Sequence, residues 1–293
     1  MRYDAGEIIT AMVTPFKENY EVDYEALEKL VNHLIDNGSD AILVAGTTGE
    51  CPTLTHEEEW DILKFVIKVV NGRVKVVMGT GSNSTQTAIM TAKKAEELGA
   101  DAILTVVPYY NKPNQRGMIA HFSAVAEAVK LPIILYNIPG RTGVNMLPAT
   151  VAELAKKYSH IVAVKQSNSD LDLISEMQEV CPADFAIYSG DDSLTLPMLS
   201  LGAHGVISVA SHVVGTDMKK MITEFKAGNN KAALEIHKKL FPIFKKLFMC
   251  PSPSPVKDLL AAKGIIKNVL RLPLVNMTDK EKEEFYTVAK QYA

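Results

Sequence analysis

The sequence contains little cysteine, little net charge and no long apolar segment. Its three cysteines in 293 residues show no CxxC spacing, which argues against a disulfide framework or a cysteine-based metal site and indicates a reducing compartment. A formal net charge of −3 offers no basic surface to nucleic acid or an acidic membrane. No apolar run approaches the roughly 18 residues that cross a bilayer, and the N-terminus lacks the pattern of a secretory signal. We therefore expect a cytoplasmic globular protein that binds neither nucleic acid nor membrane.

Short β-rich runs recur along most of the chain, and a segment with helical periodicity follows each of them. The runs begin at Ile8, Ala41, Val74, Ala102, Ile133, Ile161, Ala186 and Gly205. Strand and helix that alternate in this way predict a parallel sheet with helical crossovers. Eight such units in about 225 residues match a closed (β/α)8 barrel. An open doubly wound sheet is the alternative, but no GxGxxG follows the first run. We therefore predict an α/β fold of the TIM-barrel class.

Helix signals occur along the whole chain, and towards its end they are no longer interrupted by β-rich runs. The segment from Asp23 to Asn37 is amphipathic and ends at a glycine, and Thr55 with Glu58 forms the pattern of a capping box. After residue 228 we expect helices only, over residues 231–248, 254–263 and 279–293. The sequence thus predicts a barrel domain at 1–228 and a C-terminal helical extension at 229–293, which serves packing or subunit contact.

Chemistry in barrels of this kind is found at the carboxyl ends of the strands. These ends carry small residues, hydroxyls, phenols and one guanidinium, with few carboxylates and no histidine. They are residues 46–50, 79–83, 108–111, 136–142, 165, 189–192 and 208.

Metal and glycosidase chemistry are disfavoured by the same residues. The seven histidines show no HxH or HExxH spacing, and no pair of carboxylates ends the fourth strand together with the sixth or seventh. Asp191 and Asp192 could bind a divalent ion, but such a pair more often caps the next helix. We favour the cap and predict no metal site.

Lys165 ends an apolar run, Ile161 to Val164, and a polar turn follows it. Lysine is almost never fully buried without a compensating partner. Two interpretations stay open from this residue alone. The amine could extend into solvent or bind a phosphate, or it could form a Schiff base with a carbonyl substrate, because partial burial favours the neutral, nucleophilic form.

The neighbouring strand ends favour the Schiff base. Tyr136 ends the preceding strand and could relay protons, with Thr47 and Tyr110 as further hydroxyls. The turn at 46–49 could present backbone N–H groups to a carboxylate, and the fork of Arg141 suits a second one. Each has a plain alternative: a barrel tyrosine, a turn threonine, or an arginine paired with a surface acid.

Five motifs together resemble the dihydrodipicolinate synthase family of class I pyruvate-dependent aldolases, over essentially the whole chain. They are GTTGE (46–50), PYYNKP (108–113), YNIPGRTG (136–143), VKQS (164–167) and SGDD (189–192). The resemblance implies a (β/α)8 lyase that condenses pyruvate with L-aspartate 4-semialdehyde to 4-hydroxy-tetrahydrodipicolinate in diaminopimelate and lysine biosynthesis. The nearest alternative is another Schiff-base pyruvate aldolase, such as a sialic-acid or keto-deoxy-sugar lyase, which the arginine of YNIPGRTG disfavours. A barrel that senses small molecules without catalysis is a further alternative, disfavoured because the relay residues are all present.

The resemblance also implies roles for the catalytic residues. Lys165 would form the imine with pyruvate, and Thr47, Tyr136 and Tyr110 would relay protons. The family contributes the tyrosine at position 110 across a subunit interface, so we expect a homotetramer, a dimer of dimers, or a homodimer. No metal or organic cofactor is required by this chemistry.

The same resemblance implies the binding residues. Thr48, with Thr47, would hold the pyruvate carboxylate, and Arg141 would bind the carboxylate of the semialdehyde. Gly190 and Ile207 would line the pyruvate site through their backbone.

Lysine-inhibited relatives carry a histidine and a glutamate where this chain has Glu59 and Thr87, whereas His56 and Asn83 fit the pattern. We therefore expect weak or absent inhibition by lysine.

Overall fold

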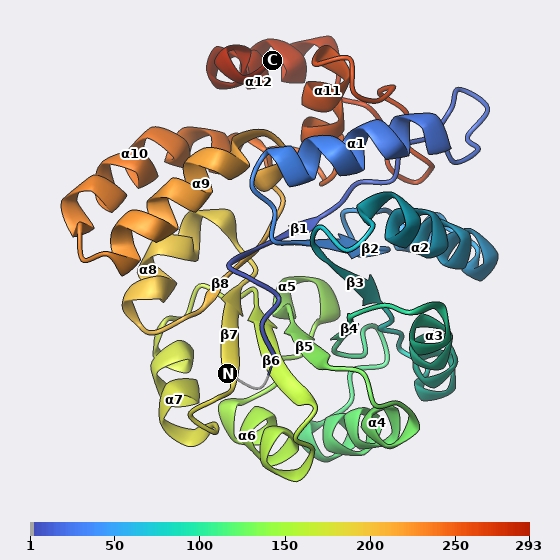
Figure 1. Ribbon diagram of the computed structural model, residues 1–293, viewed down its shortest axis with the longest axis vertical. Helices are drawn as coiled ribbons and strands as arrows, with labels where there is room; N and C mark the ends of the chain where they lie inside the picture. The colour runs from blue at the N-terminus through green and yellow to red at the C-terminus, as the bar shows by residue number, and fades with distance from the viewer. Residues whose placement is uncertain (1–2) are drawn as a thin grey trace. The chain divides into compact units, whose positions relative to one another are not determined.

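Eight parallel strands, hydrogen-bonded in chain order, form a closed barrel in the computed structural model, which describes residues 3–293 (Figure 1). The strands are β1 (Ile8–Ala11), β2 (Ala41–Val44), β3 (Lys75–Gly79), β4 (Ala102–Val106), β5 (Ile133–Asn137), β6 (Ile161–Gln166), β7 (Ala186–Ser189) and β8 (Gly205–Ser208). The predicted (β/α)8 barrel is confirmed, and each strand begins within one residue of the start of a predicted β-rich run.

Helices follow the strands as the sequence predicted. They are α1 (Tyr24–Asp36), α2 (His56–Val70), α3 (Thr85–Leu98), α4 (Gln115–Ala128), α5 (Pro139–Thr142), α6 (Pro148–Lys157), α7 (Asp172–Val180), α8 (Thr195–Ser200), α9 (Ser211–Lys226), α10 (Asn230–Lys246), α11 (Ser254–Ala262) and α12 (Asp279–Ala289). The capping box of Thr55 and Glu58 is present at the start of α2. Among the described residues, no helix is both long and apolar enough to cross a bilayer.

The chain divides into two compact units, named here after the buried lysine that each contains. The Lys165 unit comprises residues 3–6 and 76–207, and the Lys257 unit comprises residues 7–75 and 208–293. The expected division into a barrel at 1–228 and an extension at 229–293 stays a prediction.

In the Lys165 unit, neighbouring strands from β3 to β8 pair in parallel. All six residues of β6 are buried, which fits a strand covered on both faces. The pairing of β5 with β6 places Tyr136 opposite Lys165, and that of β6 with β7 places Tyr188 on the other side of the same lysine. This register brings the predicted amine and the predicted phenol together.

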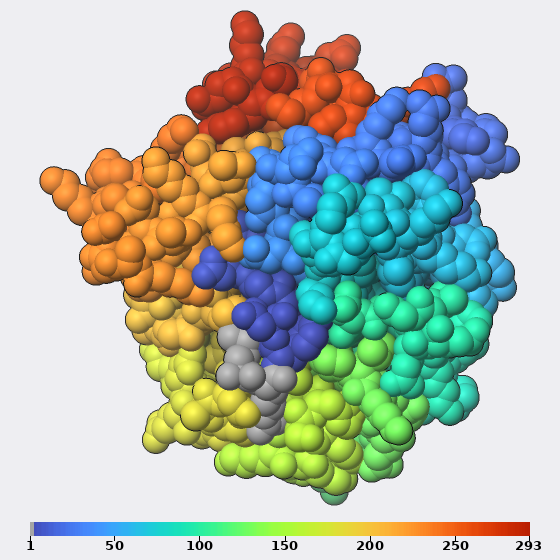
Figure 2. All heavy atoms as spheres, in the orientation of Figure 1, coloured from blue at the N-terminus to red at the C-terminus, as the bar shows by residue number. Residues whose placement is uncertain are grey.

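In the Lys257 unit, β1 pairs with β2, and α9 packs against α10. Helices and loops alone make up residues 229–293, in α10, α11 and α12. The early and late parts of this unit's chain meet on the surface, drawn in blue and in orange to red in Figure 2. Lys267 there forms an ion pair with Glu18 at 3.0 Å, and the Arg271 guanidinium donates to the carbonyl of Tyr20.

Candidate active site

Lys165 is the penultimate residue of β6 and is only 7% exposed. Its Nζ lies 4.2 Å from the centroid of the Tyr136 ring. Within residues 3–293, no carboxylate forms an ion pair with this amine. A lysine attacks a carbonyl through its amine nitrogen, which a salt bridge to a carboxylate would occupy. No such salt bridge engages Lys165 in the described part of the chain.

Tyr136 is the penultimate residue of β5 and is 6% exposed. The ring therefore covers the amine of Lys165 with one face while the strand holds both side chains in register. Because the contact uses the ring, the phenol oxygen stays a separate group that can exchange protons with a substrate.

An amide pair that the sequence analysis did not identify supports these two strand ends. Asn137 and Gln166 are fully buried, and the Asn137 side chain donates to Gln166 Oε1 at 3.1 Å and to Asn145 Oδ1 at 2.7 Å. Its own Oδ1 accepts from the backbone of Met146 at 3.0 Å. The pair fixes the ends of β5 and β6 next to Tyr136 and Lys165. The only sequence signal was a polar residue at the last position of each apolar strand.

Gly190 lies directly against Lys165. Its N–H donates to the carbonyl of Gln166 at 2.8 Å. A Cβ added here would overlap the hydroxyl oxygen of Ser167 and come within 3.0 Å of Lys165 Cε. A larger residue would have to displace the Ser167 side chain, so glycine allows the backbone to approach the Lys165 side chain closely. The Ser167 hydroxyl is buried and has no hydrogen-bond partner within the described part of the chain.

The other predicted residues of the Lys165 unit are not joined to this amine. Tyr110 is 88% exposed, with a left-handed backbone at φ 71°. Arg141 lies exposed in the four-residue helix α5, and Ile207 is buried in β8. No hydrogen bond or ring contact links Tyr110 or Arg141 to Lys165 among residues 3–293.

Thr47 and Thr48 belong to the Lys257 unit, in the turn after β2. The backbone is held tightly there: Gly49 and Glu50 donate to the carbonyls of Gly46 and Thr47, each at 3.0 Å. The N–H groups of Gly49 and Glu50 are thus used inside the turn. The N–H of Gly49 is therefore not available to a substrate carboxylate. Thr47 is half-buried and Thr48 is buried.

The predicted cap at the end of β7 is wrong as a side-chain cap. Asp191 takes the N-cap position of a short 3₁₀ helix, Asp192–Leu194, without a capping hydrogen bond from its side chain. The hydroxyl of Ser189 bonds the backbone of Asp191: it donates to the Asp191 carbonyl and accepts from the Asp191 N–H. Residues 3–293 contain no group of three or more His, Cys, Asp or Glu side chains arranged to hold a metal.

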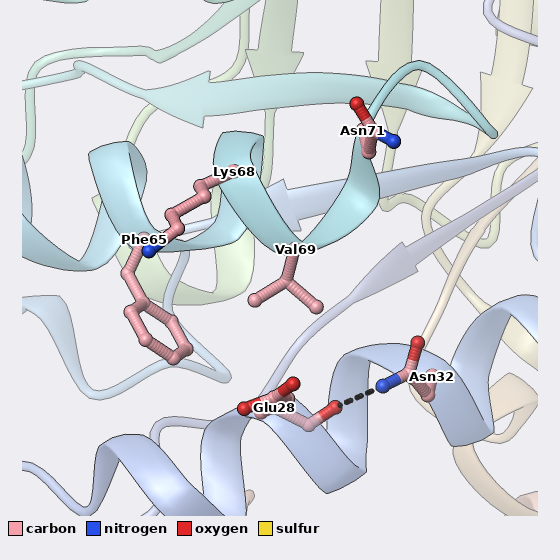
Figure 3. Close-up of a pocket in the computed structure, with 6 residues that line it drawn as sticks. All are labelled: Glu28, Asn32, Phe65, Lys68, Val69 and Asn71. Atoms are coloured by element: carbon pink, nitrogen blue, oxygen red, sulfur yellow. Dashed lines mark hydrogen bonds between the residues drawn. The ribbon is translucent and has the colours of Figure 1, made fainter.

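A surface hollow of about 320 Å³ lies between α1 and α2 and is not part of this site (Figure 3). It is lined by Glu28, Asn32, Phe65, Lys68, Val69 and Asn71. The side chain of Asn32 already donates to the carbonyl of Glu28 at 3.0 Å and accepts from Arg73 at 2.6 Å. All the lining residues belong to helices or helix ends, and none follows a barrel strand.

Comparisons with known proteins agree over nearly the full length. Residues 4–292 match the Dihydrodipicolinate synthetase family. The 4-hydroxy-tetrahydrodipicolinate synthase of Desulforamulus reducens is 50% identical over 280 residues, which is 96% of this chain and 95% of that protein. A dihydrodipicolinate synthase structure from Bacillus anthracis has a TM-score of 0.96 at 48% identity and covers 99% of both chains. Another, from Cyanidioschyzon merolae with lysine bound, has a TM-score of 0.96 at 46% identity and covers 98% of this chain and 97% of the other.

Proposed function

Because this chain belongs to the dihydrodipicolinate synthetase family, we propose that Lys165 is the amine through which it condenses pyruvate with L-aspartate 4-semialdehyde. The enzyme is a lyase whose product is 4-hydroxy-tetrahydrodipicolinate, in diaminopimelate and lysine biosynthesis. The observation that carries the proposal is the buried Lys165 amine against the Tyr136 ring, without an acid partner among residues 3–293.

The reaction follows from the chemistry of an amine and a keto acid. Lys165 Nζ attacks the ketone carbon of pyruvate to give a carbinolamine, and loss of water gives an imine. The imine withdraws electrons, so the methyl group loses a proton and an enamine forms. The enamine carbon attacks the aldehyde of the second substrate. The amino group of that substrate then displaces Lys165 as the ring closes, which frees the enzyme.

Tyr136 moves the protons of these steps, and Thr47 and Tyr110 complete the relay. The 88% exposure of Tyr110 leaves its phenol available to the site of a second subunit. We therefore propose that the enzyme works as a homotetramer or homodimer. We also propose that it works in the cytoplasm. Mass measurement by sedimentation or light scattering tests the assembly, and an active enzyme that stays monomeric at assay concentration would contradict it.

The carboxylates of the two substrates bind at different residues. Thr47 and Thr48 hold the carboxylate of pyruvate, while Gly190 and Ile207 line its site through their backbone. Arg141, exposed on α5, binds the carboxylate of the semialdehyde. Arg141→Ala is expected to raise mainly the KM for the semialdehyde, by about tenfold, as loss of one charge-assisted contact would. A change confined to the KM for pyruvate would contradict this role.

Inhibition by lysine is expected to be weak. Glu59 is buried, and its carboxylate lies 3.0 Å from His56 Nδ1. Burial raises the pKa of Glu59, while the hydrogen bond to His56 acts in the opposite direction; the His56 contact is the interaction that already occupies this carboxyl. Thr87 adds no acid that could pair with the ammonium of a lysine ligand. A titration of the reaction with lysine tests this, and clear inhibition at sub-millimolar lysine would overturn it.

Borohydride trapping tests the Schiff base directly. Pyruvate and borohydride together should add the mass of one reduced pyruvate adduct to the peptide that contains Lys165. The peptide that contains Lys257 is the internal control, because that lysine is also buried, at 0% exposure against 7% for Lys165, but is ion-paired with Glu50 and should stay unmodified. An unlabelled Lys165 peptide in active enzyme would refute the proposal.

A further inference from the structure

A second lysine, Lys257 on α11, is completely buried and has no role in the chemistry above. Its Nζ donates to Glu50 Oε1 at 2.6 Å and to the carbonyl of Val269 at 2.7 Å. Both side chains of this ion pair have an exposure of 0%. The amine also lies 4.4 Å from the centroid of the Phe16 ring. Glu50 is the last residue of the GTTGE segment, 207 positions earlier in the chain.

Arg271, from the loop after α11, holds the same segment from a second direction. Its backbone N–H donates to Glu50 Oε2 at 3.0 Å, so the C-terminal part of the chain engages both carboxylate oxygens. Its guanidinium forms a two-bond contact with Glu58, at 2.6 and 2.8 Å, and donates to the carbonyl of Thr53 at 2.7 Å. Residues 50–58 are thus fixed at both ends by Arg271.

Glu50 transmits this hold to the turn before it. Its N–H donates to the carbonyl of Thr47 at 3.0 Å, and its backbone is left-handed, with φ at 58°. A residue with a side chain is strained in that region and persists there only where the surroundings enforce it. On the other side, the Thr14 hydroxyl donates to the carbonyl of Gly49 at 2.7 Å. Lys257 and Arg271 hold both carboxylate oxygens of Glu50 and so help to enforce this conformation.

Stability alone does not explain a buried ion pair. Desolvation of two charges offsets most of their attraction, and well-packed apolar residues of the same volume often stabilise a protein equally well or better. A buried ion pair can instead select one arrangement of the chain, because any arrangement that separates the two side chains leaves a charge buried without its partner.

We propose that Lys257 and Arg271 are positioning residues for pyruvate. By holding both oxygens of Glu50, they orient Thr47 and Thr48 so that these can receive the pyruvate carboxylate. The C-terminal part of the chain is then a support of the substrate site, in addition to any packing role. This inference rests on the proposed function of the 46–49 turn.

The test compares Lys257→Met and the milder Glu50→Gln with wild type and with Lys219→Met. The control removes another lysine of the same unit, whose ion-pair partners are Asp40 and Glu7. We expect Lys257→Met to raise the KM for pyruvate about tenfold and Glu50→Gln several-fold, with a smaller effect on kcat and on the KM for the semialdehyde. The pyruvate concentration that half-saturates borohydride trapping should rise by the same factor. Lys219→Met should leave it unchanged, and Lys257→Arg should restore part of the affinity.

The outcomes separate this inference from the proposed function. If wild type is not trapped, or Thr47→Val leaves the KM for pyruvate unchanged, the proposed function of the lysine or of the turn fails first. If wild type is trapped and Thr47→Val weakens pyruvate binding, but Lys257→Met and Glu50→Gln both bind pyruvate normally, only the positioning role is overturned. Loss of activity through fewer folded molecules, without a change in KM, would also overturn it. Should Lys257→Met not fold, Glu50→Gln decides the question alone, because it changes one carboxylate oxygen to an amide nitrogen of the same size.

Discussion

Lys165 and Lys257 are both buried, and each lies over an aromatic ring, at 4.2 Å from the ring of Tyr136 and 4.4 Å from that of Phe16. Their polar partners differ. Lys257 has a carboxylate and a carbonyl within 2.7 Å, whereas no acid within residues 3–293 pairs with Lys165. Burial and ring contact are therefore common to a structural lysine and to the lysine that we assign to catalysis. The carboxylate is what separates the two roles.

Charge stabilisation gives the physical reason. Burial lowers the pKa of Lys257 to about 8, while Glu50 acts in the opposite direction, so at neutral pH most of this amine is charged and paired. A paired ammonium has no free electron pair and cannot attack a carbonyl. No carboxylate within the described residues engages the amine of Lys165 in this way.

The largest effect is expected from Lys165→Ala. Carbon–carbon bond formation should fall by at least about 10³-fold, because covalent catalysis is lost. The free energy of unfolding should fall less than in Lys257→Met, since only packing is lost and no ion pair within residues 3–293 is broken. Steady-state rates and urea unfolding measure the two quantities, and full activity in this variant would end the assignment.

Lys257→Met should lower the free energy of unfolding more than it lowers the catalytic rate. It leaves Glu50 buried without its partner, and breaking a buried pair in this way costs about 3–5 kcal/mol. Trapping at Lys165 with saturating pyruvate should persist. The double variant Glu50→Gln with Lys257→Met should recover much of the lost free energy of unfolding in urea. A single variant as stable as wild type would show that the pair is dispensable for folding.

Tyr136→Phe tests what the ring and the hydroxyl contribute to Lys165. The substitution retains the ring face under Nζ and removes only the phenol oxygen. We expect kcat to fall about 10²-fold, the usual scale of a lost general acid–base group, with a much smaller change in the KM for pyruvate. Equal losses in both parameters would argue against a relay.

The smallest predicted effect concerns pH and the buried His212 of the Lys257 unit. Burial lowers its pKa to about 4, and its Nε2 accepts from the N–H of Val13 at 3.1 Å, which requires the neutral ring. Because the folded pKa lies below the unfolded one, this contribution is present above pH 6.5 and is lost as the pH falls towards 4. Between pH 7 and 5.5 the free energy of unfolding should fall by about 1 kcal/mol from this group. In His212→Gln, urea unfolding should depend less on pH over this range, and an unchanged slope would contradict the assignment.

Much of the fold could be predicted from the sequence because its determinants are local. Apolar runs bounded by turns identified the strands, and the spacing of Thr55 and Glu58 identified the start of α2. Lys165 and Tyr136 could be paired in advance because they end consecutive strands, and consecutive strands of a parallel barrel lie side by side. The functional roles assigned to them stay proposals.

Other features could not be predicted, and each depends on residues far apart in sequence or on packing. The side-chain cap expected at Asp191 is absent, and the backbone of Asp191 is instead bonded by the hydroxyl of Ser189. The contact of Asn137 with Gln166 and the crowding of Gly190 against Ser167 depend on how neighbouring strands are aligned. No periodicity in the sequence encodes that alignment.

The sequence by itself determined the alternation of strands and helices, the capping box of α2 and the presence of one lysine at a strand end, since these depend on residues a few positions apart. Only the tertiary structure decided which buried lysine is paired and which is not. Glu50 and Lys257 are 207 positions apart, and a charge can be neutralised only by a group that folding brings within a few ångströms. The identity of a lysine is local, but its reactivity depends on its neighbours in space.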